Sequence, residues 1–349
     1  MKKSLVALSL LSALSLSADA DCEPCMSECV SYDPCCEEDP CKQFFVERCQ
    51  TFVTAEFLYW TVETNALEYS IRSTHANTAP MTYAVGTYKV ADYDFCPGFR
   101  VALAWYNYPK YWEVTGQYTW FQDSGSDSTS APTEPNKFLN PTWDVSAVGP
   151  FSNASSSINL NYQLGDLFVA RVFDPNPHLR MRILGGLTAA YIEQKWKLNY
   201  KDVNGEKDKV QNNWRLWAGG IRVGFTADWF WGGQFYFTGR TTVATLLGTY
   251  KNTSKYSTNG SFDSLIGDAE YDDHRFAIHS QIILGPSWQL PCECWSIEAF
   301  AGYEFNVWLN LHETINVSQL CLNDIPKQTQ HSNGLFGTHG LTLRLSVGF

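Results

Sequence analysis

The end of the chain, residues 341–349, reads LTLRLSVGF, with an apolar residue at every odd-numbered position. Successive side chains of a β-strand point to opposite sides, so this alternation predicts a strand with one apolar and one polar face. Leu341, Leu343 and Leu345 lie on the apolar face, and Arg344 lies on the polar face. The stretch therefore predicts a sheet that is wet on one side only.

The same period of two recurs in seven earlier segments. A barrel strand that crosses a membrane needs about 9–11 residues, with apolar side chains outward, polar ones inward, and Trp and Tyr at the two interfaces. We therefore expect an all-β fold: an antiparallel transmembrane β-barrel of the outer membrane with about 12–14 strands, or as many as 16 if the stretches 61–95 and 143–173 hold more. The seven segments are 99–105, 112–120, 179–187, 217–229, 235–243, 274–284 and 295–307.

The connections are expected to differ in length. Stretches rich in Ser, Thr, Pro and Asp predict long extracellular loops at 123–142 and 251–269, and a further loop is expected at 314–338. Short turns are predicted at 107–110 and 175–178, and a hairpin tip at 201–210.

The chain ends on Phe349. A terminal amphipathic strand that closes on an aromatic residue resembles the assembly signal of bacterial outer-membrane barrels. We therefore interpret Phe349 as part of the signal that the barrel-assembly machinery reads. The last strand of a soluble sheet is the alternative.

Composition excludes some classes of function. Lys plus Arg is 25 and Asp plus Glu is 36, which gives a formal net charge of −11. Nucleic acid is not expected as a partner, because phosphate binding calls for a basic face. Charged residues make up 17% and aromatic residues 15% of the chain. A soluble domain has about 25% charged residues, so aromatic surface has replaced charge.

The first 20 residues predict a secretory signal peptide. Lys2 and Lys3 form a positive start, an uncharged run rich in Leu, Ala and Ser follows, and Ala18-Asp19-Ala20 fits the small-x-small cleavage pattern. A membrane anchor is the weaker interpretation, because the apolar run is too short to span a bilayer. Export to the bacterial cell outer membrane is expected, with three regions: the signal peptide 1–20, an acidic cysteine-rich segment 21–49, and the barrel 50–349.

Cysteines are concentrated near the start, with seven of the 11 in residues 22–49. Disulfides are expected in an exported chain, and an odd total leaves one thiol free or paired with another molecule. We interpret the segment as a tail that cross-links to neighbouring envelope proteins; an internally stapled knot or a metal site built on Cys22-x-x-Cys25 are the alternatives. The predicted disulfide or cross-link residues are Cys22, Cys25, Cys29, Cys35, Cys36, Cys41, Cys49, Cys96, Cys292, Cys294 and Cys321.

If the apolar alternates face lipid, the opposite face lines the interior. Seven of the 11 arginines fall on it. Walls of fixed charge set ion preference in a pore, so a water-filled channel with a charged constriction is expected. The alternative is that these groups are ion-paired and only stabilise the barrel. The predicted pore-lining residues are Glu56, Arg100, Glu113, Arg180, Arg182, Arg222, Asp228, Arg240, Arg275, Glu298, Glu304 and Arg344.

Signals for catalysis are weak. The local acid–histidine cluster is Asp272-Asp273-His274, with His279 nearby, and a solvated loop end is the simpler interpretation. The sequence has no Gly-x-Ser-x-Gly, His-Glu-x-x-His or phosphate-cradling motif. We expect neither an enzyme nor a cofactor.

Several segments carry a family resemblance. Val53-Thr54-Ala55-Glu56-Phe57-Leu58-Tyr59-Trp60, soon after a cysteine-rich start, resembles the first strand of the major-outer-membrane-protein-like porins (MOMP-like) of Chlamydia-related bacteria and Legionella. Pro97-Gly98-Phe99-Arg100-Val101, residues 182–187 with 192–194, and residues 214–229 are similar in the same order. The resemblance covers roughly residues 50–349. It implies a general diffusion porin, a disulfide-bonded outer envelope, and barrels that often form homotrimers.

The sequence therefore predicts an outer-membrane porin that passes ions and small hydrophilic solutes through a charged, open lumen. The alternative is a structural, disulfide-cross-linked envelope protein or surface adhesin whose barrel is only an anchor, with a plugged lumen. A lipid-uptake barrel is a third, weaker idea, because the charged interior argues against an apolar pocket.

Overall fold

The computed structural model describes residues 50–73, 86–107, 110–143, 151–176, 178–232, 234–257, 265–291, 295–318 and 328–349. These residues belong to the compact unit Pro40–Phe349. The predicted signal peptide (1–20), the cysteine-rich segment (21–49) and every cysteine except Cys96 lie outside the described residues. None of the described residues forms a helix long and apolar enough to cross a membrane.

The described part of the chain is an all-β, antiparallel, single sheet of thirteen strands, a number within the predicted range. The period-two segments of the sequence all fall on strands. The strands are β1 (Gln50–Thr64), β2 (Glu68–Ser73), β3 (Gly86–Val90), β4 (Cys96–Asn107), β5 (Trp112–Ser130), β6 (Leu139–Pro141), β7 (Phe151–Asn176), β8 (Leu179–Asp202), β9 (Lys207–Gly232), β10 (Phe235–Ser257), β11 (Leu265–Pro291), β12 (Ser296–Ser318) and β13 (Gln328–Gly348).

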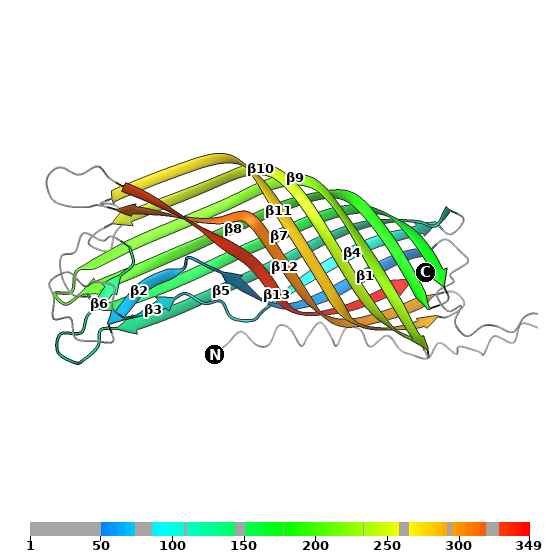
Figure 1. Ribbon diagram of the computed structural model, residues 1–349, viewed down its shortest axis with the longest axis horizontal. Helices are drawn as coiled ribbons and strands as arrows, with labels where there is room; N and C mark the ends of the chain where they lie inside the picture. Colours follow the sequence, from blue (N-terminus) through cyan, green and yellow to red (C-terminus); the bar gives the residue numbers. More distant parts are fainter. Residues whose placement is uncertain are drawn as a thin grey trace, which may run out of the picture. The chain divides into compact units, whose positions relative to one another are not determined.

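Ten of these strands form a closed ring. Their order is β7-β5-β4-β1-β13-β12-β11-β10-β9-β8, and β8 pairs back onto β7 over nearly its whole length. The first and last strands of the ring, β1 and β13, are neighbours, with Phe52 opposite Gly348. Closure leaves the ring without an edge strand, so every strand finds hydrogen-bond partners on both sides. Figure 1 shows the tilted strands wound around one axis.

The short strands β2, β3 and β6 branch from the ring. β6 reaches β7 through Leu139 opposite Phe151, and β2 pairs with β6 and β3. Tyr69 of β2 is fully buried, and its hydroxyl donates a hydrogen bond of 2.8 Å to Asp127 of β5. The stretch 61–95, which the sequence pattern does not resolve, holds β2 and β3 of this extension.

The two ends of the ring differ in their connections. At the end where β1 begins and β13 finishes, β4 to β5, β7 to β8, β9 to β10 and β11 to β12 are joined by a few residues, as predicted for 107–110 and 175–178. At the opposite end the strands reach far beyond the membrane length of about 9–11 residues. The hairpin tip predicted at 201–210 is a tight turn at residues 203–206.

The predicted long loops are wrong in part. Much of 123–142 and 251–269 is strand, because β5 runs to Ser130, β10 to Ser257, and β11 begins at Leu265; residues 328–338 of the third loop likewise belong to β13. In β5 the inward positions beyond Phe121 are Asp123, Gly125, Asp127 and Thr129, and the outward ones are serines and Gln122. Both faces are small or polar there, so the hydrophobic alternation that marks a strand is missing.

Candidate functional site in the barrel interior

The outer wall of the ring carries an apolar band between two belts of aromatic residues. In β9, for example, exposed Ile221 and Val223 lie between Trp217 and Trp229. An apolar band bordered by two aromatic belts is the surface that such a barrel presents to a bilayer. The belt at the short-turn end contains Trp105, Trp112, Trp229, Trp231, Phe235 and Phe349, and the other belt contains Tyr59, Phe99, Trp120, Tyr191, Trp217 and Tyr303.

These belts divide the barrel into two zones. We call the part between them the membrane zone, which on β8 runs from Leu179 to Tyr191. The part beyond the second belt is the outer zone, which on β8 runs from Ile192 to Asp202. The longer connections lie at the end of the outer zone, and long connections are extracellular in such barrels.

A layer of buried polar side chains crosses the interior of the membrane zone. Its first centre is the Arg100 guanidinium of β4, which donates to Glu56 of β1 at 2.6 Å and to Glu304 of β12 at 2.7 and 3.0 Å. Thr342 of β13 also donates to Glu304, at 3.0 Å. The Arg100 Nε donates to Thr119 of β5 at 2.9 Å. Arg100 and both carboxylates are almost inaccessible to water.

The second centre of this layer is Arg222 of β9. Its Nε lies 3.2 Å from Asp166 of β7, and its terminal nitrogens donate to Thr242 of β10 and Thr188 of β8. A terminal nitrogen also lies 2.8 Å from Nδ1 of His279 in β11. Because arginine only donates, this Nδ1 is the acceptor and the imidazole proton sits on Nε2, 3.3 Å from the Asn306 side-chain oxygen.

The two centres are joined, and together they involve all ten strands of the ring. Gln281 of β11 accepts from Thr242 at 3.3 Å and donates to Glu304 at 2.6 Å. We name this set of side chains around Arg100 and Arg222 the polar layer. Its arginines, carboxylates and His279 are all buried, so little water reaches these side chains.

Below the polar layer, toward the short turns, the interior charges are paired and partly reached by water. Arg182 lies 3.0 Å from Asp228 and 3.8 Å from Glu113, and its side chain is 27% exposed. Arg240 differs, because its guanidinium lies 5.2 Å over the Phe168 ring. Two further pairs are Arg180 with Asp174 at 2.9 Å and Arg344 with Glu298 at 2.7 Å.

In the outer zone the interior is an aromatic core. Trp214 packs edge-on against Phe336, with ring centroids 5.9 Å apart, and stacks near Tyr250 at 6.0 Å. Tyr162 meets Trp308 edge-on at 6.2 Å. Arg275 lies over Tyr250 and pairs with Glu313. Further fully buried members of this interior are Trp60, Trp196, Tyr69, Tyr200 and Phe121.

His312 belongs to this core. The Trp214 indole N–H donates a hydrogen bond of 3.1 Å to its Nδ1. Burial lowers the pKa of His312 from 6.5 to about 4, against smaller opposing effects of the Asn65 backbone and Glu313. The imidazole is therefore neutral at pH 7, which suits its role as acceptor.

All twelve predicted pore-lining residues lie on the inner face, so the sequence phase places them correctly; their role in a pore stays a prediction. The residues that sequence reasoning missed are the inward aromatics. Their signal is present but inverted: in β8, Trp196, Leu198 and Tyr200 point inward while Lys195 and Lys197 point outward. If the rule that apolar residues face outward is extended into the outer zone, it places these aromatic residues on the outer wall, whereas they lie in the interior.

Two other predicted features are placed by the structure. His274 and Asp272 are exposed on the outer face, and Asp273 pairs with Arg275 at 3.6 Å. His279 points to the interior, where its ring stacks on Trp308 at 4.3 Å. Cys96 forms no disulfide with another described residue. Phe349 pairs through its backbone with Thr51, at 2.9 and 3.0 Å.

A closed antiparallel ring with an apolar, aromatic-bordered outer wall and a polar interior belt defines an outer-membrane β-barrel protein. Residues 46–349 match the family described as Legionella pneumophila major outer membrane protein precursor, and the chain belongs to that family. This confirms the resemblance found in the sequence, and it assigns the protein to the outer membrane.

Similar solved structures share little sequence with the chain. The outer membrane protease OmpT from Escherichia coli is 10% identical with a TM-score of 0.40, over 86% of this chain and 96% of that chain. A Pseudomonas aeruginosa FadL homologue is 9% identical with a TM-score of 0.24, over 89% and 92%. The P. putida toluene transporter TodX is 6% identical with a TM-score of 0.24, over the same shares. The comparison with curated proteins gives no match.

Proposed function

We propose that this outer-membrane protein is a closed barrel that serves as a rigid anchor in the envelope. The observation that carries the proposal is the polar layer, in which buried Arg100 and Arg222 connect side chains from all ten strands of the ring. Barrels of about 8 strands have interiors that side chains fill, whereas 16–18 strands leave an aqueous channel. A ring of ten strands lies near the filled limit.

The aromatic core of the outer zone supports the same role. An ion that passed the polar layer would next meet buried Trp308, Tyr162 and Trp214. Opening a path would expose these buried side chains, and fully burying an apolar side chain is worth about 1.5–3 kcal/mol. The outer zone is also long enough to carry loops away from the membrane, because Ile192–Asp202 of β8 adds roughly 35 Å of tilted strand at about 3.3 Å per residue.

The cysteines fit this role as sites of attachment. We propose that thiols of residues 22–49 link the barrel to other envelope proteins, in which case the anchor is held covalently as well as by the membrane. The proposal includes no catalysis: Asp272 and Asp273 are engaged in ion pairs with Lys251 and Arg275.

A porin for ions and small hydrophilic solutes is the second candidate. The observation that favours it is the partial exposure of the paired charges below the polar layer, such as Arg182 and Glu298, at 27% and 26%. These groups form a charged vestibule that water reaches. A porin would require the polar layer and the aromatic core to open, and a homotrimer is the assembly that the family resemblance suggests.

Single-channel recording in a planar bilayer separates the two candidates. The full-length mature protein, checked for folding by heat-modifiable mobility, is recorded with and without reductant. The anchor proposal predicts silence in both conditions, together with high-molecular-weight species on non-reducing gels that reductant dissolves. Stable conductance steps would overturn it and make the porin the leading function.

If steps appear, the charged interior can be tested directly. Arg222→Gln with Arg240→Gln should then reduce or reverse the salt preference measured in asymmetric salt, because both guanidiniums lie in the lumen. Lys195→Gln with Lys197→Gln is the matched control, since it also removes two positive charges but from the outer face.

A further inference from the structure

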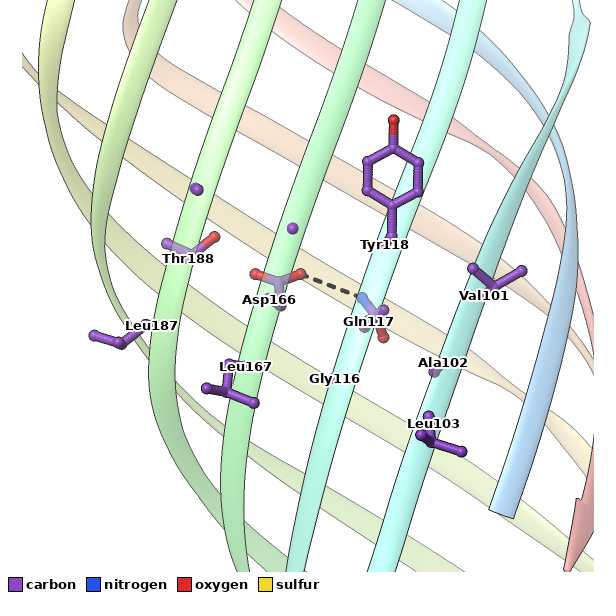
Figure 2. A pocket seen from close by; sticks show the side chains of 12 residues that line it. Val101, Ala102, Leu103, Gly116, Gln117, Tyr118, Asp166, Leu167, Leu187 and Thr188 are labelled. Carbon is purple, nitrogen blue, oxygen red and sulfur yellow. Dashed lines mark hydrogen bonds between the residues drawn. The ribbon is translucent and has the colours of Figure 1, made fainter. Parts of the chain in front are cut away.

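The outer wall of the membrane zone has an apolar hollow across β4, β5, β7 and β8. Its volume is about 670 Å³, and its walls are the exposed side chains of Leu103, Tyr118, Leu167 and Leu187. Figure 2 shows these residues on neighbouring strands, with Gly116 between Leu103 and Leu167. A Cβ atom built at Gly116 or Gly165 would meet nothing within 4 Å. The missing side chains therefore make the hollow.

A second, polar hollow lies on the same wall above the first. Its volume is about 440 Å³. Counting outward residues along the strands, only the row Trp120, Gln163 and Tyr191 separates the two hollows. The Tyr118 hydroxyl donates to Gln163 at 3.1 Å across this row. The residues that line the polar hollow are Cys96, Gln122, Asp123, Ser124, Asn159, Leu160, Asn161, Glu193 and Lys195. Asp123 is buried at 4% exposure, so the exposed charges of the hollow are those of Glu193 and Lys195.

The outer face around the polar hollow is rich in cations. Of the 14 lysines in the chain, three lie on the outer zone of β8, the last strand that lines the hollow: Lys195, Lys197 and Lys201. Lys195, Lys197 and Arg215 are exposed there. Glu193 tempers this charge, because it lies 3.1 Å from Lys195 and accepts a 3.3 Å hydrogen bond from the Tyr191 hydroxyl.

We propose that the two hollows form one binding groove for a phosphorylated membrane lipid whose headgroup also carries hydroxyls. An acyl chain lies in the apolar hollow against Gly116 and Gly165. The headgroup phosphate lies against Lys195 and Lys197, and the Asn159 and Asn161 amides hydrogen-bond to the headgroup. The Glu193 carboxylate accepts hydrogen bonds from the hydroxyls of the headgroup.

The order of chemistry along the groove favours a lipid over a second copy of the chain. From the membrane zone outward, the wall presents apolar surface, then a row with Trp120 and Tyr191, then amides and cations. This is the order in which an anionic lipid presents its chain, interface and headgroup. A second copy related by a two-fold axis would set this cationic face against itself.

Titration of the full-length protein with diphosphorylated lipid A in detergent, read by native mass spectrometry, tests the groove. Gly116→Leu with Gly165→Leu adds side chains where a Cβ atom has open space, so that they occupy the apolar hollow, and we expect at least about ten-fold weaker binding. Gly185→Leu with Gly219→Leu is the matched control. Both glycines face outward with at least 3.9 Å of space and lie outside the hollow, so affinity should be unchanged.

The headgroup is tested in the same way. Lys195→Gln with Lys197→Gln should weaken binding at least about ten-fold, because each cation near an anionic headgroup contributes on the order of a few-fold. Lys251→Gln with Lys255→Gln removes the same charge from β10, which contributes no residue to either hollow, and should have little effect. The wild-type protein should bind dephosphorylated lipid A as weakly as the Lys195 and Lys197 variant binds diphosphorylated lipid A. Inorganic phosphate should not compete with the lipid.

Three results would overturn the proposal. Equal affinity in wild type and in both groove variants would show that no lipid is bound there. Loss only in the lysine variant would reduce the site to a surface charge without a chain groove. A lower oligomeric mass of the Gly116 and Gly165 variant in light scattering, with lipid affinity unchanged, would identify the hollow as an interface between copies.

Discussion

The membrane zone and the outer zone are built from the same strands, but the apolar side chains point outward in the first and inward in the second. In β8, Ile183 and Leu187 point outward below Tyr191, whereas Trp196 and Leu198 point inward above it. No register shift occurs on β8 between them. The phase changes because the surroundings of the wall change from lipid to water while the backbone continues unaltered.

The comparison teaches that each zone hides a different kind of side chain. In the membrane zone lipid receives the apolar face, so the interior must satisfy its polar groups internally, as the polar layer does. In the outer zone water covers the outside, and the interior is a hydrophobic core like that of a soluble protein. The two zones should therefore respond differently to mutation.

The largest effect is expected in the polar layer. Arg100→Leu leaves Glu56 and Glu304 buried without their cation, and breaking such a buried pair costs about 3–5 kcal/mol. Urea unfolding in micelles, followed by heat-modifiable mobility, measures the loss. Arg215→Leu removes an exposed arginine from the same barrel and should change stability by less than about 0.5 kcal/mol. Similar losses in the two variants would show that the polar layer is not a stabilising centre.

Nearly as large an effect is expected in the aromatic core. Trp214→Ala removes a fully buried ring and the hydrogen bond to His312, and should cost about 3–5 kcal/mol. Trp217→Ala is the natural control, because the ring three residues away is 63% exposed on the outer wall. An equal loss at both positions, measured by the same unfolding assay, would contradict a water-excluding core in the outer zone.

The difference in outward-facing residues between the two zones can be tested by placing a charged residue on the outer wall of the membrane zone and an apolar residue on the outer wall of the outer zone. Leu187→Lys puts a charge on the lipid face and should cost about 2–4 kcal/mol, as charged substitutions near the midplane do. Lys197→Leu puts an apolar residue on the water-facing wall and should change stability by less than about 0.5 kcal/mol. Both are measured as unfolding free energies in vesicles. A costly Lys197→Leu together with a tolerated Leu187→Lys would place the membrane elsewhere.

The last prediction concerns pH and the outer zone. The folded protein protonates His312 only near pH 4, whereas an unfolded histidine does so near 6.5. Between these values the unfolded state holds more protons, so stability falls as pH drops from 6.5 toward 4. His312→Gln keeps an acceptor for Trp214 but does not titrate, so its unfolding midpoint should fall less over this range. Parallel pH profiles of the two proteins would refute the assignment.

Local sequence patterns predicted much of the membrane zone. Alternation in stretches such as 217–229 and 341–349 fixes strands and faces, because one face meets lipid and the other does not. The inward phase of Arg100, Arg222 and Glu304 follows from the same rule. Where both faces are polar, as in 123–130, the rule gives no signal, and these residues were wrongly assigned to a loop.

The strand period, the outer-membrane class and the inward position of the charges follow from the amino-acid order, because they depend on neighbours along the strand. The closure of the ring by ten strands, the contact of Arg100 with Glu304 and the apolar interior above Tyr191 are visible only in the folded barrel. Those features depend on pairing between residues far apart in sequence and on which solvent surrounds each height of the wall. Neither is encoded in the local alternation of side chains.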